Sequence, residues 1–315
     1  MSDPTITERE IATQPDCWRR AALDARDALA GGFAEALPGP GERVAVAGCG
    51  TSWFVAQSYA ALREAAGQGE TDAFAASAFP VARGYDRVVA ITRSGTTTEV
   101  LDLLAALRER RPDTPVLVLT ADPTSPALRA ARHVVVLDYA DERSVVQTRF
   151  ATSALAFLRA ALAGTGPLPA GVKPLAEAVD DAELALRHPL PADVVSAGQW
   201  TFLGQGWGYG LALEAALKLR EAAGAWTEAY PAMEYRHGPV AVAAPGRVVW
   251  LFGPAPAGLA DEVRRTGALL VADGAVDPLA GLVRAQRLAV AVAAARGLDP
   301  DRPRHLTRSV VLTTG

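Results

Sequence analysis

The sequence predicts an α/β protein built from two tandem, doubly wound parallel sheets, with an N-terminal helix and a C-terminal tail. Short apolar, β-branched runs alternate with helical patterns along most of the chain, which is typical of parallel sheets covered by helices on both faces. A Gly-x-Gly turn follows a strand pattern at Gly48 and again at Gly204. Two copies of one α/β unit are the simplest explanation of this recurrence.

The elements are expected in the following order. Residues 1–33 are expected to form a helical arm. The expected strands lie at 43–48, 87–92, 115–120, 133–137, 200–206, 247–253 and 267–273. The expected helices lie at 52–66, up to 110, and at 147–163, 209–223 and 285–298. The predicted domains are a first sheet subdomain at 34–165, a second at 190–298 and a tail at 299–315, with a Gly- and Pro-rich linker at 164–174.

Composition excludes several classes of protein. The chain has 315 residues, 50% of them hydrophobic, and a formal net charge of −4, which argues against nucleic-acid binding. Cys17 and Cys49 suit neither a disulfide framework nor a metal site, so we expect a reduced, cytoplasmic protein without metal. The polar N-terminus is no signal peptide, and no apolar run of about 18 residues predicts a membrane span.

A hydroxyl-rich turn, "TRSGTTTE" at 92–99, joins the second strand to its helix. Ligands of open α/β sheets bind at such carboxyl ends, where a helix N-terminus offers free N–H groups to an anion. Hydroxyls could simply cap the helix. Five hydroxyls in seven residues, with Gly95 allowing close approach, exceed that need. The turn therefore indicates a phosphate site, to which Ser52 on the first Gly-x-Gly turn could add a donor.

A second segment, "EAALKLREAAGAWTEAYPAMEYRHGP" at 214–239, is rich in carboxylates. Glu214, Lys218 and Glu221 have the spacing of one helix face, a pattern that also suits a solvated stripe. His237 lies in the irregular polar segment that follows and fits an acid/base role. Only two of the 31 basic residues are lysines, which makes Lys218 notable. The remaining histidines are expected to be structural: His133, His188 and His305.

Together these segments resemble the SIS (sugar isomerase) family of phosphosugar-binding proteins. The resemblance is nearest to the isomerase half of glutamine–fructose-6-phosphate amidotransferases and to stand-alone AgaS-type aminosugar-phosphate isomerase/deaminases. It also rests on "ERSVVQTRFATS" at 142–153 and on the tail "DPDRPRHLTRSV" at 299–310. The resemblance implies flavodoxin-like subdomains, a homodimer whose site lies at or near the interface, a sugar phosphate as ligand and no organic cofactor.

The resemblance also implies residue roles. Glu221 would move a proton between C1 and C2 of a hexose or hexosamine 6-phosphate. His237 would assist ring opening, in its own site or in that of a partner subunit, and Lys218 and Glu214 would orient the reacting groups. The residues implied to hold the 6-phosphate are Ser52, Thr92, Ser94 and Thr97. The residues implied to line the substrate are Gly50, Thr51, Arg93, Gly95, Gln147, Thr148, Glu228 and Arg308.

Three departures from the family bear on the reaction. The synthases form an imine with a tail lysine, but the corresponding residue is Arg308, which stays protonated. Neither cysteine stands at residue 2, so we expect no glutaminase activity. Thr96 replaces a glutamate of the synthases. These departures favour an isomerase, a deaminase or a deglycase over a glucosamine-6-phosphate synthase.

Two other function classes compete with an enzyme. SIS domains also occur in regulators, so the chain could bind a sugar phosphate without turnover. A dinucleotide-binding oxidoreductase is disfavoured, because the full GxGxxG run is absent at 48–53 and no acidic residue ends the second strand.

Overall fold

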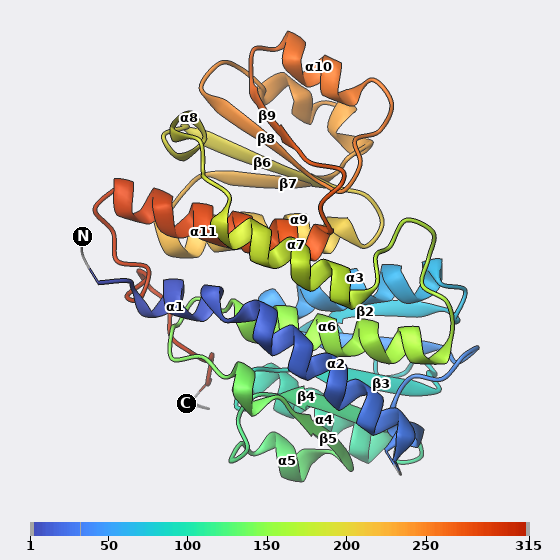
Figure 1. The fold of residues 1–315 in the computed structure, drawn as a ribbon. Helices are drawn as coiled ribbons and strands as arrows, with labels where there is room; N and C mark the ends of the chain where they lie inside the picture. The colour runs from blue at the N-terminus through green and yellow to red at the C-terminus, as the bar shows by residue number, and fades with distance from the viewer. Residues whose placement is uncertain (1–2, 32, 313–315) are drawn as a thin grey trace. The chain divides into compact units, whose positions relative to one another are not determined.

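The computed structural model describes residues 3–31 and 33–312, which form two compact units (Figure 1). The five-stranded unit comprises residues 16–142, 149–175 and the tail from Thr307. The four-stranded unit comprises the N-terminal residues to Pro15, the short segment 143–148, and residues 176–306. Each unit is described by itself.

The sheet of the five-stranded unit is parallel throughout, in the order β2-β1-β3-β4-β5. Its order reverses between β1 and β3, whose residues Ala47 and Ala90 are paired. All five residues of β1 and of β3 are buried, which explains why their apolar runs were readable in the sequence. The strands are β1 (Val44–Gly48), β2 (Thr71–Ala75), β3 (Arg87–Ile91), β4 (Val116–Thr120) and β5 (His133–Val136).

Helices cover both faces of this sheet. Alternate residues of β1 and β3 point to opposite faces, and Ala45, Ala47, Val88 and Ala90 pack on the helix after β3. The helix after β1 lies on the other face, beside α6. The α-helices assigned mainly to this unit are α2 (Gln14–Ala30), α3 (Thr51–Ala65), α4 (Thr98–Arg110), α5 (Ala127–Ala130) and α6 (Arg149–Thr165). Its 3-10 turns are η1 (Ala34–Ala36), η2 (Ala76–Ala78) and η3 (Asp138–Ala140).

The four-stranded unit repeats this order, since its parallel sheet runs β7-β6-β8-β9. One face packs on α10 and η4, and the other on α9 and α11. The strands are β6 (Gln199–Gly204), β7 (Thr227–Pro231), β8 (Arg247–Phe252) and β9 (Leu269–Ala272). The helices are α1 (Ile6–Ala12), α7 (Leu175–Arg187), α8 (Ala192–Val195), α9 (Gly208–Ala223), α10 (Leu259–Arg265) and α11 (Pro278–Ala295), with 3-10 turns η4 (Glu234–Arg236) and η5 (Pro239–Val242).

The repeat extends to the atomic detail of the two Gly-x-Gly turns. A Cβ on Gly48 would lie 2.6 Å from the carbonyl carbon of Ser52, and one on Gly204 would lie 2.3 Å from the carbonyl oxygen of Gly208. Each turn therefore needs glycine to let the next helix start against the strand. The predicted fold class, two doubly wound parallel sheets, is confirmed.

Sequence patterns missed β2 and β7, and placed the start of α11 seven residues late. Both missed strands lie at a sheet edge and are mostly half-buried, so they lack the continuous apolar run of the central strands. In α11, Pro278 and the N-cap Asp277, whose side chain accepts a hydrogen bond from the Leu279 N–H, mark the true start.

Among the described residues, α11 alone is long and apolar enough to cross a membrane by length and composition. It packs against α9 and β8 as a core helix of its unit, with 61% of its residues buried. The expectation that no run of about 18 residues is apolar enough was therefore wrong for this helix, although length and composition alone are weak evidence for a span.

Candidate functional site

The hydroxyl-rich turn lies where the strand order reverses. β1 and β3 are neighbours, so their carboxyl ends lie side by side and lead directly into α3 and α4. Gly50, Thr51 and Ser52 lie at the first end, and the Thr92–Thr98 turn at the second. The reversal point of an open α/β sheet is the place where its ligands bind.

Neither helix start is capped by a side chain. The N-cap of α3 is Gly50, with φ +52°, and the N-cap of α4 is Thr97, whose hydroxyl makes no capping hydrogen bond. The hydroxyls of this turn are therefore not explained by capping alone. Two adjacent helix N-termini that no side chain caps favour an anion between them, because their backbone N–H groups point toward it.

Gly95 fixes the shape of the turn. Its φ is +60°, and a Cβ there would lie 2.3 Å from Ser125 Oγ, on the turn that follows β4. The backbone can pass this close only without a side chain.

The hydroxyl of Thr92 is buried and has no hydrogen-bond partner among the described residues, and the same holds for Ser125. Ser94, which is 8% exposed, accepts hydrogen bonds from the backbone N–H and hydroxyl of Thr96 (3.2 and 2.9 Å). A buried hydroxyl without a partner costs free energy. Thr92 thus offers a donor that the protein itself does not use.

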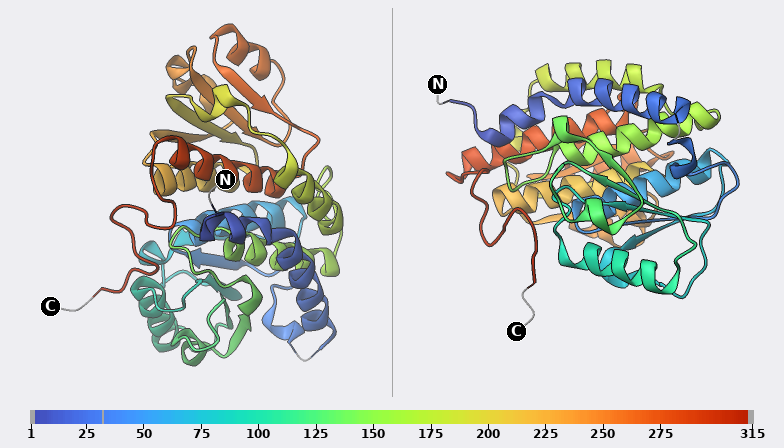
Figure 2. Two further views of the ribbon diagram at one scale, coloured as in Figure 1. Left: turned by 60° about the vertical axis from the view of Figure 1, so that its left-hand side comes forward. Right: turned by 90° about the horizontal axis from the view of Figure 1, so that it is seen from below.

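The tail runs along this turn, as Figure 2 shows for the red segment that passes the start of α4. Ser309 Oγ lies 3.2 Å from Ser94 Oγ and 2.9 Å from Thr96 Oγ1. The Val310 carbonyl accepts a hydrogen bond from the Thr98 N–H at 3.2 Å. A segment more than 200 residues away in sequence therefore covers the hydroxyl turn.

Arg93 is 4% exposed and is held on two sides. Its guanidinium lies 3.5 Å from the fully buried carboxylate of Glu142 and donates a hydrogen bond to the Arg308 carbonyl at 2.8 Å. Glu142 also accepts a hydrogen bond from the backbone N–H of Arg149 at 2.8 Å. The side chain of Arg308 pairs with Asp141. Arg93 therefore ties the turn to the tail and to the segment before α6.

In the four-stranded unit, α9 carries a buried charge cluster. Glu214 and Lys218 are 0% and 1% exposed, and Lys218 Nζ lies 3.3 Å from Glu214 Oε1. The same ammonium donates a hydrogen bond to Glu221, whose side chain is 19% exposed. The predicted helix face thus exists, but it faces inward and is not a solvated stripe. Glu221 is its most exposed carboxylate.

The remaining predicted residues of this unit are spread out. Glu228 lies on β7, with Oε2 buried and unpartnered among the described residues. His237 is exposed and follows η4, beyond the carboxyl end of β7, whereas Glu221 precedes the amino end of that strand. Gln147 and the buried Thr148 belong to segment 143–148. Topology therefore assigns His237 and Glu221 to opposite ends of β7.

Sequence reasoning did not single out Glu142, Ser125 or Ser309. Glu142 begins the segment 142–153, but no sequence pattern indicates that it pairs with Arg93. Ser125 and Ser309 meet the turn only through the fold. In the part of the chain that the structure describes, no group of three or more His, Cys, Asp or Glu side chains is placed to hold a metal ion.

Comparison with known proteins adds family evidence. Residues 40–163 match the SIS domain model. The chain is 29% identical over 342 residues to the glutamine–fructose-6-phosphate aminotransferase (isomerizing) of Methanothermobacter thermautotrophicus, covering 96% of this chain and 57% of that protein. The corresponding enzyme of a Nostoc species is 30% identical, covering 86% and 52%. The chain thus spans about half the length of the curated relatives it matches.

Solved structures share the fold over most of this chain. A glucosamine-6-phosphate deaminase from Thermotoga maritima superposes with a TM-score of 0.80 and 26% identity, covering 98% of this chain and all of that one. A tagatose-6-phosphate ketose/aldose isomerase from Escherichia coli superposes with a TM-score of 0.78 at 19% identity, covering 94% and 95%, which is evidence of fold alone.

Proposed function

We propose that this chain is a cytoplasmic phosphosugar enzyme. The premise is that it contains a SIS domain homologous to the isomerase part of glutamine–fructose-6-phosphate aminotransferases. Its reaction is aldose–ketose isomerisation or deamination of a hexose or hexosamine 6-phosphate, by proton transfer between C1 and C2. The relatives that support this class include a glucosamine-6-phosphate deaminase and the isomerizing aminotransferases.

The observation that carries the proposal is the Thr92 hydroxyl, which is buried without a hydrogen-bond partner. Thr92 directly follows β3, and the helices that follow β1 and β3 both start without a side-chain cap. A phosphate monoester fits such a site, because its dianion accepts hydrogen bonds from neutral hydroxyls and from backbone N–H groups. The proposed phosphate ligands are Ser52, Thr92, Ser94 and Thr97. Contacts to a phosphate remote from the reacting carbons would fix the sugar for proton transfer.

Glu221 is the proposed base. An enediol or enolamine intermediate requires one group to remove a proton next to a carbonyl or iminium and return it one carbon away. Glu221 is the carboxylate of the α9 cluster that a substrate could reach. Lys218 and Glu214 would hold its carboxylate in place. A buried charge cluster costs desolvation free energy that an apolar cluster would avoid, which supports a role beyond packing.

His237 is the proposed ring-opening group. Its exposure, and its position at the other end of β7 from Glu221, favour a homodimer in which His237 serves the site of the partner subunit. Arg308 cannot form an imine, so the proposed substrates are those that need no imine with the protein.

The variant Thr92→Val tests the phosphate assignment directly. Valine keeps the shape and removes a hydroxyl that is unpartnered in the free protein, so the free energy of unfolding should stay level or rise. Calorimetric titration with glucose 6-phosphate should show an affinity about tenfold lower than that of the unmodified chain.

An unchanged affinity would remove Thr92 from the site. If the unmodified chain binds no sugar phosphate, the proposed function fails. Binding without turnover of any hexose or hexosamine 6-phosphate would instead make this a sugar-phosphate sensor.

A further inference from the structure

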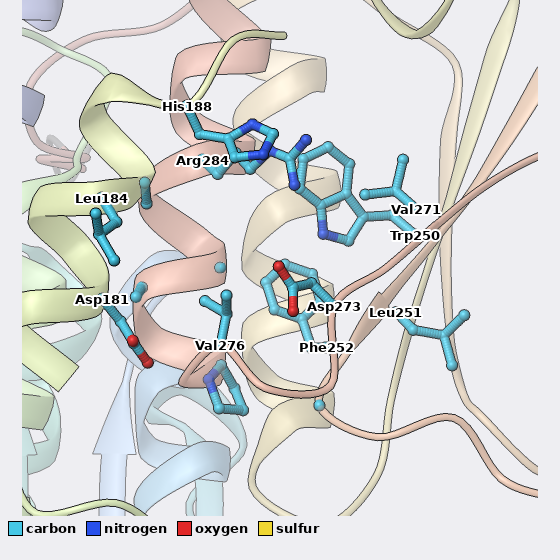
Figure 3. A pocket seen from close by; sticks show the side chains of 15 residues that line it. Asp181, Leu184, His188, Trp250, Leu251, Phe252, Val271, Asp273, Val276 and Arg284 are labelled. Carbon is cyan, nitrogen blue, oxygen red and sulfur yellow. The ribbon is translucent and has the colours of Figure 1, made fainter. Parts of the chain in front are cut away.

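A hollow in the four-stranded unit lies apart from the residues discussed so far. It is bounded by α7, α11 and the carboxyl ends of β8 and β9, as Figure 3 shows. It is a small hollow of about 70 Å³ that opens to solvent. The carboxyl ends of parallel strands are also where such sheets bind ligands.

The walls of the hollow are mostly apolar. Trp250 and Phe252 come from β8, Val271 from β9, Val276 from the loop before α11, and Leu184 from α7. Leu184 is 63% exposed, although it is a large aliphatic side chain. Trp250 and Phe252 are only 3% and 4% exposed, so the apolar body of a small molecule would chiefly cover the water-facing surface of Leu184, Val271 and Val276.

Two opposite charges point into this space. Arg284 lies with its guanidinium carbon 5.3 Å from the centre of the Trp250 ring, and its buried Nε has no hydrogen-bond partner among the described residues. Asp273, directly after β9, is exposed. Burial lowers the pKa of Arg284, and the charge of the Asp273 carboxylate opposes that shift, so the two groups interact electrostatically. They nevertheless form no ion pair within 4.0 Å.

Two further polar side chains line the hollow, and each already makes one hydrogen bond within the protein. Asp181 accepts a hydrogen bond from the backbone N–H of Asp277 at 2.7 Å. The His188 ring makes a 2.9 Å hydrogen bond to the carbonyl of Pro189. This leaves Arg284 and Asp273 as one cation and one anion beside an apolar wall.

We propose that this hollow binds a small zwitterion with an apolar body, of the chemistry of an apolar α-amino acid. The ligand carboxylate accepts hydrogen bonds from Arg284, and its ammonium donates to Asp273. The ligand side chain packs against Leu184 and Val276. A purely anionic ligand would meet the Asp273 charge, and a polar sugar would leave the apolar wall uncovered. The proposal does not depend on the proposed function.

Calorimetric titration of the full chain with L-phenylalanine and L-leucine tests this assignment. We expect binding of at least one of them, and a loss of about tenfold or more in affinity for Asp273→Asn and for Arg284→Gln. The matched control is Asp180→Asn, an exposed aspartate on the same helix as Asp181 that does not line the hollow, and it should bind like the unmodified chain.

Ligand analogues keep the test independent of folding. N-acetyl-L-phenylalanine lacks the ammonium, so the unmodified chain should bind it about tenfold more weakly than L-phenylalanine, and Asp273→Asn should bind both alike. Absence of binding at 10 millimolar, on the order of the weakest useful affinity, would overturn the proposal. So would binding that neither Asp273→Asn nor Arg284→Gln weakens, or binding of glucosamine 6-phosphate here in place of the amino acids.

Discussion

At the scale of single residues, the account depends on two side chains. One is buried without a hydrogen-bond partner, and the other is the partly exposed member of a buried charge cluster. The Thr92 hydroxyl is buried without a partner, and Glu221 is the accessible end of a buried cluster. Capping and packing do not require either arrangement. The proposed function gives each a role, Thr92 as a phosphate donor and Glu221 as the base.

Ser94→Ala should raise KM for the sugar phosphate, because it removes one donor to the dianion, at a cost of about 1–3 kcal/mol. The change leaves Glu221 untouched, so kcat should stay nearly constant. Steady-state kinetics measure both constants. Ser77→Ala, which removes an exposed hydroxyl of the same unit, is the control. A KM equal to that of the control would exclude Ser94 from phosphate binding.

Glu221→Gln should lower kcat by about 10²–10⁴-fold, the usual contribution of a general base, with little change in KM. The amide can still accept the hydrogen bond from Lys218, so the cluster should persist. Glu177→Gln on the exposed surface of α7 provides the matched change of charge. Full activity of the Glu221 variant would show that another group moves the proton.

At the scale of elements, two turns depend on glycine for close backbone packing, and the start of α1 is fixed by hydrogen bonds. Gly95 lets the hydroxyl-rich turn pass Ser125, and Gly48 lets α3 start against β1. In the other unit, the Asp301 carboxylate accepts hydrogen bonds from the backbone N–H groups of Ile6 and Thr7 at 2.6 and 2.8 Å. The contacts of Gly95 with Ser125 and of Asp301 with α1 link segments that the sequence alone does not pair.

Gly95→Ala should destabilise the five-stranded unit, by about 1–2 kcal/mol for the left-handed backbone alone, with a further cost for the clash with Ser125. The double variant with Ser125→Gly should recover only the part of the cost that is due to Ser125, because the contact with Ala127 Cβ at 3.0 Å remains. Urea unfolding measures the difference. Gly84→Ala, where a Cβ would meet nothing within 4 Å, should be nearly neutral. Equal stabilities of the Gly95 and Gly84 variants would contradict the turn geometry.

Asp301 should make the four-stranded unit sensitive to acid. Burial alone would raise the pKa of this carboxyl, but hydrogen bonds from Thr7 and the backbone outweigh it and lower the pKa below its ordinary value. Its contribution to stability is therefore present above the unfolded pKa of about 4 and is lost as pH falls through the folded value. Asp301→Asn should flatten the decline of the melting temperature between about pH 5 and pH 3; an unchanged slope would contradict this.

The elements also show how far sequence patterns reach. Buried central strands such as β1 and β3 were predictable because both of their faces are apolar, and α9 was predictable from its helical period. The edge strands β2 and β7 were not, since a half-buried strand of mixed polarity gives no clear period. The sequence also singled out the residues of the hydroxyl-rich turn and of the α9 cluster. The link from Arg93 to Glu142, and the place of Ser309, come only from long-range packing.

At the scale of the whole molecule, the repeated strand order points to duplication followed by division of labour. The first unit keeps the hydroxyl turn, whereas the second has "FGPAPAG" at the equivalent place and carries the charge cluster instead. The proposed homodimer would combine Glu221 of one subunit with His237 of its partner.

Subunit complementation tests that dimer. Glu221→Gln and His237→Ala should each be nearly inactive alone. In a co-refolded equimolar mixture, half of the dimers are mixed, and each has one intact site, so about a quarter of the unmodified activity should return. Sedimentation velocity on the unmodified chain would establish the dimer independently. A mixture that stays inactive would place both groups in the same subunit's site or in none.

Proton transfer on a sugar phosphate is the central claim, and it is tested most directly by NMR in D₂O with a panel of hexose and hexosamine 6-phosphates. The account predicts that deuterium enters C1 or C2, or that ammonia is released, with the unmodified chain and not with Glu221→Gln. Saturation transfer to a bound sugar phosphate, without exchange or product, would contradict the enzyme and leave a sugar-phosphate sensor.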